Sequence, residues 1–423
     1  EVEKEDGTKE TVEKVPAKKM AKIVKRPVAI NDIHPLWTKH PNECSDEDYK
    51  EFYRKVFHDY KEPLFWIHLN MDYPFNLKGI LYFPKINTEY ESIEGTIKLY
   101  NNQVFVADNI KEVIPEFLLL LKGVIDCPDL PLNVSRSALQ NDGFVKKISD
   151  YITKKVADKL SGMCKTDKEN YEKYWDDINP FIKFGCLKDE KFAEKMNDYI
   201  IFKNLEGKYL TLKECLEENK EKHENTVFYV TDEVEQSQYI NMFKNEGIDA
   251  VILTHNIDQP FITNMESKNE NLKFKRIDAD LSDSFKEETS KDELKDMTEK
   301  LSKTFKDALG KENLTVNVEK LKDASISSMI TLSEESRRMQ DMMKMYGMAG
   351  MDPNMFGAEG QTLVLNANND LVKYVAEHTD GENTKIICEQ LYDLAMLSHA
   401  PLSPEQMTGF IARSNKIMEL LAK

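Results

Sequence analysis

Residues 129–142 read DLPLNVSRSALQND and connect a strongly apolar segment to a long amphipathic one. The apolar segment, Val113–Val124, is expected to form a helix, and a second helix is expected over Phe144–Met163. Pro131 fixes its own φ and pushes the preceding residue towards an extended conformation. The stretch therefore predicts a loop held between two regular elements.

Polar side chains in this loop form a candidate site. Asn133 or Ser135 can cap a new helix, and Arg136 and Gln140, spaced i, i+4, then share one of its faces. A permanently charged guanidinium beside an amide is suited to gripping phosphate oxygens. The alternative is an ordinary capped helix start with a solvated arginine, and the spacing alone does not separate the two.

Composition indicates a soluble, charge-rich protein of several domains. A soft prior of about 150 residues per domain suggests about three units in 423 residues. The net charge of −17 argues against a nucleic-acid partner, because neutralising phosphates requires a basic surface. No apolar run approaches the ~18 residues of a membrane span, and no signal peptide opens the chain. We therefore expect a cytoplasmic protein with no nucleic-acid and no membrane partner.

Sequence motifs for metal, nucleotide and covalent chemistry are absent. The cysteines are scattered without a C-x-x-C pattern, which favours reduced, buried thiols. There is no zinc-type Cys/His spacing, no G-x-S-x-G and no P-loop. His68 and His255 lie at the ends of expected strands, where a structural role is the simpler interpretation. We expect no metal site, and an independent hydrolase is poorly supported.

The first half of the chain begins with a charged segment and continues as an α/β pattern. The first 26 residues alternate Glu and Lys with almost no large apolar residue, which is typical of a flexible linker. A capped helix is expected after Ser45, with strands over Leu64–Leu69 and Gly79–Phe83. Thr96–Val106 fits either a hairpin or an unbroken strand.

A second α/β pattern follows a helix expected over Tyr171–Phe184. Strands are expected over Val227–Val230 and Ala250–Leu253, separated by a helix over Glu233–Asn245, and this alternation indicates a parallel or mixed sheet of βαβ type. The polar run Ser282–Lys291 marks a domain boundary. Beyond it the pattern is mostly helical, with helices expected over Leu294–Leu309, Ser333–Tyr346, Glu382–Leu397 and Pro404–Leu421 and a short strand over Thr315–Val318.

Methionine is unusually dense in residues 329–355, which contain eight of the 18 methionines of the chain. Met339, Met342 and Met343 share one face of the expected helix with Tyr346. One interpretation is a soft core filler. The other is a surface that accepts many apolar partners, because unbranched, polarizable side chains adapt to different shapes.

The last two expected helices are apolar enough to require a cover. Packing on the preceding domain would supply one, and a four-helix bundle with a second copy of the chain would supply another. We expect a homodimer formed through seven apolar residues of these helices, namely Ile387, Leu391, Leu394, Phe410, Ile411, Ile417 and Leu420.

Four motifs occur in an order that resembles the middle domain of the heat shock protein 90 chaperone family, of the bacterial HtpG type. They are Pro35-Leu36-Trp37-Thr38, Asp48-Tyr49-Lys50-Glu51-Phe52-Tyr53, Ile80-Leu81-Tyr82-Phe83-Pro84 and Leu130-Pro131-Leu132-Asn133-Val134-Ser135-Arg136. The methionine-bearing helix and terminal hairpin resemble the C-terminal domain of that family by order and length. The C-terminus, Leu420-Leu421-Ala422-Lys423, lacks the acidic cochaperone-binding tail of eukaryotic cytosolic members.

The resemblance implies a multidomain fold of the α/β and α+β classes. Residues 1–27 are then a charged linker, and 28–160 are a large middle α/β subdomain with a catalytic loop. Residues 161–284 are a small middle α/β subdomain joined to it by helices, and 285–423 are a mostly helical C-terminal dimerisation domain. The N-terminal nucleotide-binding domain of the family is expected to be missing in front of the linker.

The resemblance also implies an ATP-driven, homodimeric clamp that binds partly folded client proteins, with roles in protein folding and the stress response. Arg136 corresponds to the catalytic-loop arginine that reaches the γ-phosphate, Gln140 to a neighbouring phosphate contact, and Asn133 to a supporting loop residue. ATP with Mg would bind in the N-terminal domain. This chain alone is therefore expected to bind no cofactor and to be inactive, whereas the full-length protein would be an ATPase.

Client contacts and an alternative function complete these expectations. Client binding is expected at Met339, Met342, Met343 and Tyr346 from the methionine pattern, and at Phe261 from the resemblance. The alternative is a constitutive dimeric scaffold or holdase without an ATP-driven cycle, which explains the terminal hairpin but gives Arg136 no task.

Overall fold

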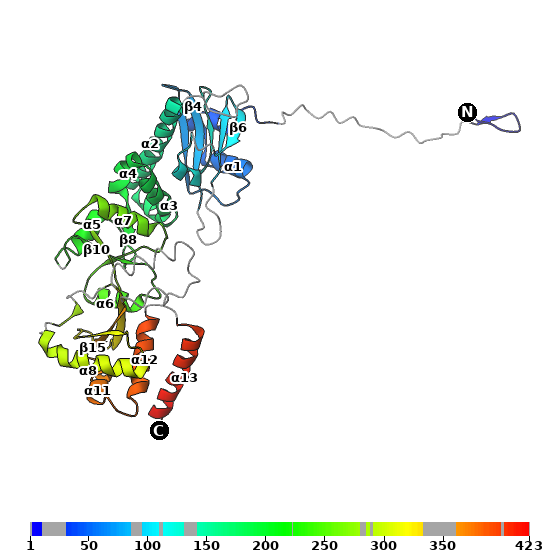
Figure 1. The fold of residues 1–423 in the computed structure, drawn as a ribbon. Coiled ribbons are helices and arrows are strands. Elements are labelled where there is room, and N and C mark those ends of the chain that lie inside the picture. Colours follow the sequence, from blue (N-terminus) through cyan, green and yellow to red (C-terminus); the bar gives the residue numbers. More distant parts are fainter. Residues whose placement is uncertain are drawn as a thin grey trace.

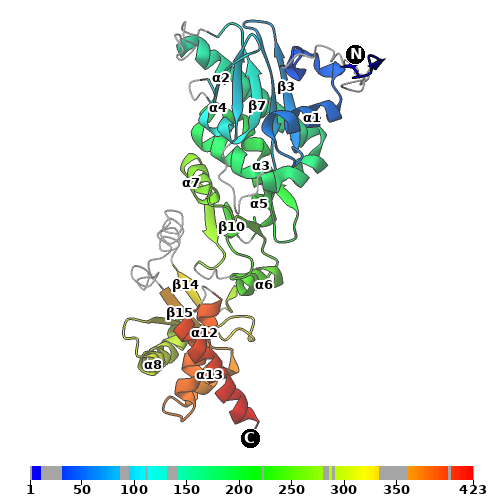
Figure 2. The same ribbon diagram turned by 90° about the vertical axis from the view of Figure 1, so that its right-hand side faces the viewer.

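The computed structural model describes residues 2–10, 31–85, 95–109, 113–130, 142–221, 223–279, 285–287, 291–332, 361–398 and 402–422. Beyond a short N-terminal hairpin, β1 (Val2–Glu3) with β2 (Lys9–Glu10), these residues form successive units. In two perpendicular views the units follow one another along a long axis (Figure 1, Figure 2). The expected multidomain α/β and α+β fold is confirmed.

The first unit is a five-stranded mixed sheet with strand order β3-β4-β7-β5-β6. Only β5 and β7 pair in parallel, and the other neighbours are antiparallel. The strands are β3 (Phe65–Met71), β4 (Leu77–Phe83), β5 (Ile97–Asn101), β6 (Val104–Asp108) and β7 (Lys122–Asp126).

Both faces of this sheet are buried, because alternate residues of β4 enter two different cores. Ile80 and Tyr82 pack with Trp37 under α1 (Asp46–Phe57) and the short 3-10 helices η1 (Leu36–Thr38) and η2 (Pro41–Glu43). Leu81 and Phe83 face the opposite side and join the core formed by the following helices. Ser45 caps α1 in a capping box with Asp48, as expected.

The prediction of a helix over Val113–Val124 is wrong. The segment instead forms a short 3-10 helix, η3 (Glu116–Leu120), followed by strand β7. Residues 122–126 are apolar because the strand lies in the middle of a sheet covered on both faces, and a short apolar run of this kind has no period that separates strand from helix. The alternative left open for Thr96–Val106 is settled as a hairpin, β5 and β6, which turns at Asn102 and Gln103 with positive φ.

A helical hub connects the large sheet to the rest of the chain. It consists of α2 (Asp142–Thr166), α3 (Lys168–Lys188) and α4 (Glu190–Met196). A Cβ on Gly185 would lie 2.7 Å from the Phe192 ring and 2.9 Å from the Phe117 ring, so α3 approaches both aromatic side chains closely. Helix α3 therefore packs tightly against α4 and against residues 116–120.

The second α/β unit contains a parallel sheet of order β11-β10-β12, as the alternation of the sequence predicted. Its strands are β10 (Thr226–Val230), β11 (Ala250–Ile252) and β12 (Lys273–Arg276), and its crossing helices are α6 (Ser237–Asn245) and α7 (Asp258–Lys268). It is preceded by η4 (Asn197–Tyr199), β8 (Ile201–Lys203), β9 (Tyr209–Thr211) and α5 (Leu212–Glu218).

Strand β10 contributes alternate side chains to two separate cores. Val227 and Tyr229 belong to the core of the hub, whereas Phe228 and Val230 pack with α6 and with apolar residues of the C-terminal region such as Met329. The Tyr239 hydroxyl of α6 also donates a 2.6 Å hydrogen bond to a backbone carbonyl of that region.

The C-terminal region contains a three-stranded sheet as well as helices. The sheet has the order β13-β15-β14, and the sequence indicated only its first strand. The elements are α8 (Lys291–Leu309), β13 (Thr315–Glu319), β14 (Ser328–Leu332), β15 (Gln361–Asn366), α11 (Asp370–Glu377), α12 (Thr384–Leu397) and α13 (Pro404–Leu421). Figure 1 shows α12 and α13 side by side at the end of the chain.

Candidate functional site

The candidate catalytic residues lie between two described parts of the chain. Asn133, Arg136 and Gln140 themselves lie outside the described residues. On one side the description reaches Leu130, whose side chain is buried in the core of the hub. On the other side it resumes with α2 at Asp142. The structure therefore describes the residues on either side of this segment, which together form a platform for it.

Asp126, the last residue of β7, fixes the edge of this platform. Its Oδ2 accepts a 3.1 Å hydrogen bond from the indole Nε1 of Trp37 and a 2.9 Å bond from the backbone N–H of Gln103. The carboxylate is buried, and hydrogen bonds to a charged group contribute about 1.5–3 kcal/mol each. Asp126 thus ties β7 to the β5–β6 hairpin and to the first aromatic core.

The three residues after Asp126 are held by hydrogen bonds to neighbouring parts of the chain. Asn101 donates from its amide nitrogen to the carbonyls of Cys127 (3.1 Å) and Pro128 (3.2 Å). Asp129 accepts a 2.7 Å bond from the backbone N–H of Asn76. Burial raises the pKa of the Cys127 thiol to about 12, so this cysteine stays protonated and structural. Residues 127–129 are consequently held by hydrogen bonds from both Asn101 and Asn76.

An exposed apolar strand borders the platform. On β6, the edge strand of the large sheet, Val104 is 46% and Phe105 48% exposed. The Phe105 ring packs on Tyr100, which in turn contacts Trp37. Edge strands rarely leave large apolar side chains in water, so this edge is a candidate contact surface beside the loop.

A buried ion pair joins the hub to the second α/β unit. The ammonium of Lys183 in α3 contacts Oδ1 of Asp258, the first residue of α7, and both side chains are almost fully buried. Oδ2 of Asp258 accepts a 2.9 Å bond from the backbone N–H of His255. The Lys183 Nζ also lies 5.9 Å from the centroid of the Phe261 ring. No sequence signal singled out this pair, because its members are 75 positions apart.

The two histidines at strand ends have structural surroundings. His255 Nδ1 accepts a 3.2 Å bond from the N–H of Ile257, and burial lowers the pKa of its ring. His68 Nδ1 lies 2.7 Å from the Tyr49 hydroxyl, and burial likewise lowers its pKa. Both rings are therefore predominantly neutral at pH 7.

The predicted client-contact residues are not brought together in the described part of the chain. Met339, Met342, Met343 and Tyr346 lie outside the described residues. Phe261 is only 2% exposed and belongs to the core of the hub, on the inner side of α7. In this conformation Phe261 offers almost no surface to a client.

The predicted dimerisation residues divide into a buried group and an exposed group. Leu391 is buried and Ile387 partly buried in the C-terminal core, and Phe410 and Ile417 are half-buried. The remaining residues are exposed in this chain, by 42% for Leu394, 52% for Ile411 and 46% for Leu420.

A polar clamp holds α13 against α12. The Arg413 guanidinium pairs with Asp393 and, at 3.2 Å, with Glu389, and its Nε donates to Gln390 at 3.0 Å. Burial raises the pKa of Asp393, an effect that the neighbouring Arg413 opposes. No residue of α13 is fully buried, so the helix leaves apolar side chains exposed beside these polar contacts.

The described residues contain neither a candidate metal site nor a candidate membrane-spanning helix. No group of three or more His, Cys, Asp or Glu side chains there is arranged to hold a metal ion. Among the same residues, no helix is long and apolar enough to cross a membrane.

Comparisons with known proteins support the resemblance seen in the sequence. The family described as "Hsp90 protein" matches residues 1–423. "Chaperone protein HtpG" of Bacteroides thetaiotaomicron is 42% identical over 366 residues, covering 83% of this chain and 53% of the relative. The protein of the same name from Porphyromonas gingivalis is 41% identical over 362 residues, covering 82% and 52%.

A more distant relative extends the match. "Chaperone protein HtpG" of Sulfurimonas denitrificans is 27% identical over 407 residues, which are 92% of this chain and 63% of that protein. The chain spans about half the length of the first two relatives, 53% and 52%. With its whole length matched by one family and with relatives above 40% identity, the chain belongs to the Hsp90 family.

Proposed function

We propose that this chain is the middle and C-terminal portion of an ATP-dependent, homodimeric chaperone clamp that binds partly folded client proteins in the cytoplasm. The observation that carries the proposal is the family match over residues 1–423, together with relatives that are named chaperones. The test is ATP turnover by the full-length protein, with and without Arg136.

The proposed contribution of the middle region is an arginine supplied to ATP bound elsewhere. In phosphoryl transfer, a preorganised cation meets the charge that develops on the transferred oxygens. Such a cation must be held in place, and the bonds of Asp126, Asn101 and Asp129 fix the base of the loop that carries Arg136. ATP with Mg is expected to bind in the N-terminal part of the full-length protein, with Gln140 and Asn133 supporting the arginine.

Dimerisation is proposed through the exposed apolar side of α12 and α13. We expect the 423-residue chain to be a dimer in solution at micromolar concentration. Ile411→Asp combined with Leu420→Asp should give a monomer, because each charge would have to be buried without a partner. Light scattering after size exclusion measures the mass.

The matched control for the dimer is Leu371→Asp. Leu371 lies on α11 in the same region and is 48% exposed, close to the 52% of Ile411. This variant should remain dimeric. A monomeric mass for the unchanged chain would contradict the proposed dimer outright.

Client holding is proposed through the methionine-rich stretch. We expect Met342→Ala with Met343→Ala to weaken suppression of the aggregation of chemically denatured citrate synthase, because two adaptable apolar side chains are lost. The mass of the dimer should not change. Met345→Ala is the matched control, since a helical period places Met345 away from the shared face. Undiminished suppression by the double variant would count against the methionine surface.

The second candidate function is a constitutive scaffold or holdase without an ATP-driven cycle. The exposed apolar side of α13 favours any dimer, with or without ATP. The two functions differ in turnover, because only the clamp predicts ATP hydrolysis that depends on Arg136.

A further inference from the structure

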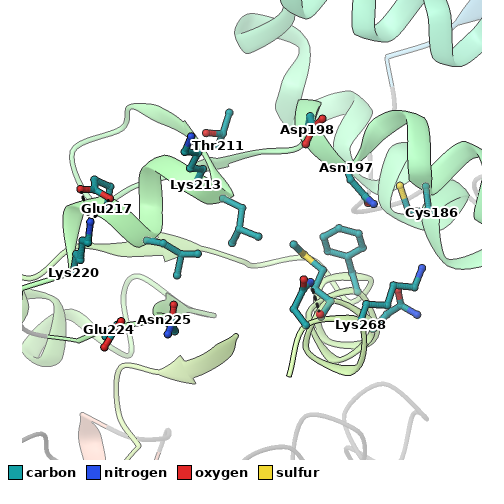
Figure 3. A pocket seen from close by; sticks show the side chains of 17 residues that line it. Cys186, Asn197, Asp198, Thr211, Lys213, Glu217, Lys220, Glu224, Asn225 and Lys268 are labelled. Carbon is teal, nitrogen blue, oxygen red and sulfur yellow. Dashed lines mark hydrogen bonds and ion pairs between the residues drawn. The ribbon is translucent and has the colours of Figure 1, made fainter. Parts of the chain in front are cut away.

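A cleft of about 800 Å³ lies between α5 and α7, where the hub meets the second α/β unit. Figure 3 shows this cleft, with Cys186 contributed by α3 of the hub, Asn197 by η4 and Asn225 by the turn before β10. Its volume falls within the ~300–1,000 Å³ of binding pockets in general. Nothing in the proposed clamp cycle uses this cleft.

The floor of the cleft is apolar, and helices α5 and α7 both contribute to it. Leu212 and Leu216 of α5 are spaced i, i+4 and line it from one side, and Met265 of α7 lines it from the other, whereas Phe261 of α7 is only 2% exposed. Leu212, Leu216 and Met265 are only partly buried. Cys215, by contrast, is buried in the core. Helix α5 therefore packs through Cys215 and still presents two leucines to the cleft.

The rim carries uncharged hydrogen-bonding groups without partners. The side-chain amides of Asn197, Asn225 and Asn264 line the cleft, and none of them bonds to another described residue. Each amide provides two donors and one acceptor. An extended polypeptide presents one N–H and one C=O per residue, so these amides match the main chain of a peptide.

The charges around the cleft balance. It has as many lysines as acids, namely Lys213, Lys220 and Lys268 against Asp198, Glu217 and Glu224. Lys220 and Glu217 pair with each other at 3.2 Å. A phosphate or another small anion would find no excess of positive charge here, whereas a neutral segment meets no repulsion.

We propose that this cleft binds a short extended, uncharged segment of a partly folded protein, with apolar side chains on the leucine–methionine floor and the main chain against the asparagine amides. The inference rests on the proposed client-binding function and assigns it a second contact region, apart from the methionine-rich stretch. The neutrality of the cleft and its free amides favour a peptide over other occupants.

Photocrosslinking tests the proposal on the 423-residue chain. The photoreactive residue p-benzoyl-phenylalanine replaces Asn264, inside the cleft, or Thr263, which is exposed on the same helix and does not line the cleft. The probe is fluorescent, reduced and carboxymethylated α-lactalbumin, which stays unfolded. We expect at least tenfold more crosslinked product from position 264 than from position 263.

A second variant tests the apolar floor. Leu216→Asp in the position-264 background should reduce crosslinking about tenfold, equivalent to ~1.4 kcal/mol, because a client side chain would then desolvate a carboxylate. Val234→Asp is the matched control, since Val234 is exposed and lies outside the cleft. Melting curves of all variants confirm that the fold is retained.

The outcomes separate this inference from the proposed function. Fluorescence anisotropy measures total binding of the probe by the unsubstituted chain. Binding without preferential crosslinking at position 264, or crosslinking that Leu216→Asp leaves unchanged, overturns the cleft but leaves client binding standing. Crosslinking at position 264 to a second copy of the chain overturns the peptide as occupant. Absence of any binding overturns both.

Discussion

Replacing Arg136 with alanine in the full-length protein should lower steady-state ATP turnover by about 10³–10⁵-fold, the range for loss of an arginine that contacts the transferred phosphoryl group. Nucleotide affinity should change little, because the cation is required mainly where charge develops in the transition state. Turnover and affinity are measured in parallel on the same preparations. A selective loss of turnover would place Arg136 at the reacting phosphate.

The matched control for this result is Lys146→Ala. Lys146 is an exposed cation in the first turns of α2, close in sequence to the loop, and its removal should leave turnover within about twofold if no phosphate contact is lost. Equal turnover in the Arg136 variant and the unchanged protein would reduce Arg136 to a helix-start residue. The constitutive scaffold would then be the better account.

The second large effect is expected at the ion pair between the hub and α7. Lys183→Met should destabilise the chain by about 3–5 kcal/mol, because it leaves the buried Asp258 carboxylate without its counter-charge. Urea unfolding curves measure the change in free energy. Lys183→Met together with Asp258→Asn should recover most of the loss, since no charge then remains at this position and an amide oxygen still faces the N–H of His255.

An exposed lysine on the same helix provides the control for the buried pair. Lys168 pairs with Glu172 at 3.5 Å near the start of α3, where its side chain is 57% exposed. Lys168→Met should cost no more than about 0.5 kcal/mol, as for other exposed i, i+4 pairs. A loss from Lys183→Met as small as this would mean that water reaches the Lys183–Asp258 pair.

Local signals in the sequence were sufficient for elements with clear ends. Helix α13 has the expected bounds, Pro404–Leu421, because Ser403 caps it and Pro404 occupies its first position. Helix α1 begins at its expected cap for the same reason. The parallel sheet around β10 also followed from alternation along the chain. Each of these features is encoded by neighbours in sequence.

Features that depend on distant partners were missed or misread. Strands β14 and β15 are short, and β15 pairs with β13 and β14 across gaps in the chain that no local pattern reveals. The expected helix over Val113–Val124 failed because a buried central strand and a buried helix are equally apolar. Among site residues, the roles of Asp126, Asn101 and Lys183 depend on contacts made by folding, and no local pattern marked them.

Strand β10 contributes side chains to two cores, and this has a consequence for the stability of both regions. Neighbouring residues of this strand pack into two cores, one with the hub and one with the C-terminal region. If β10 leaves one core, its side chains in the other core are therefore exposed as well. Protection against amide hydrogen exchange in these regions should then rise and fall together. We therefore expect the two regions to open as one cooperative unit.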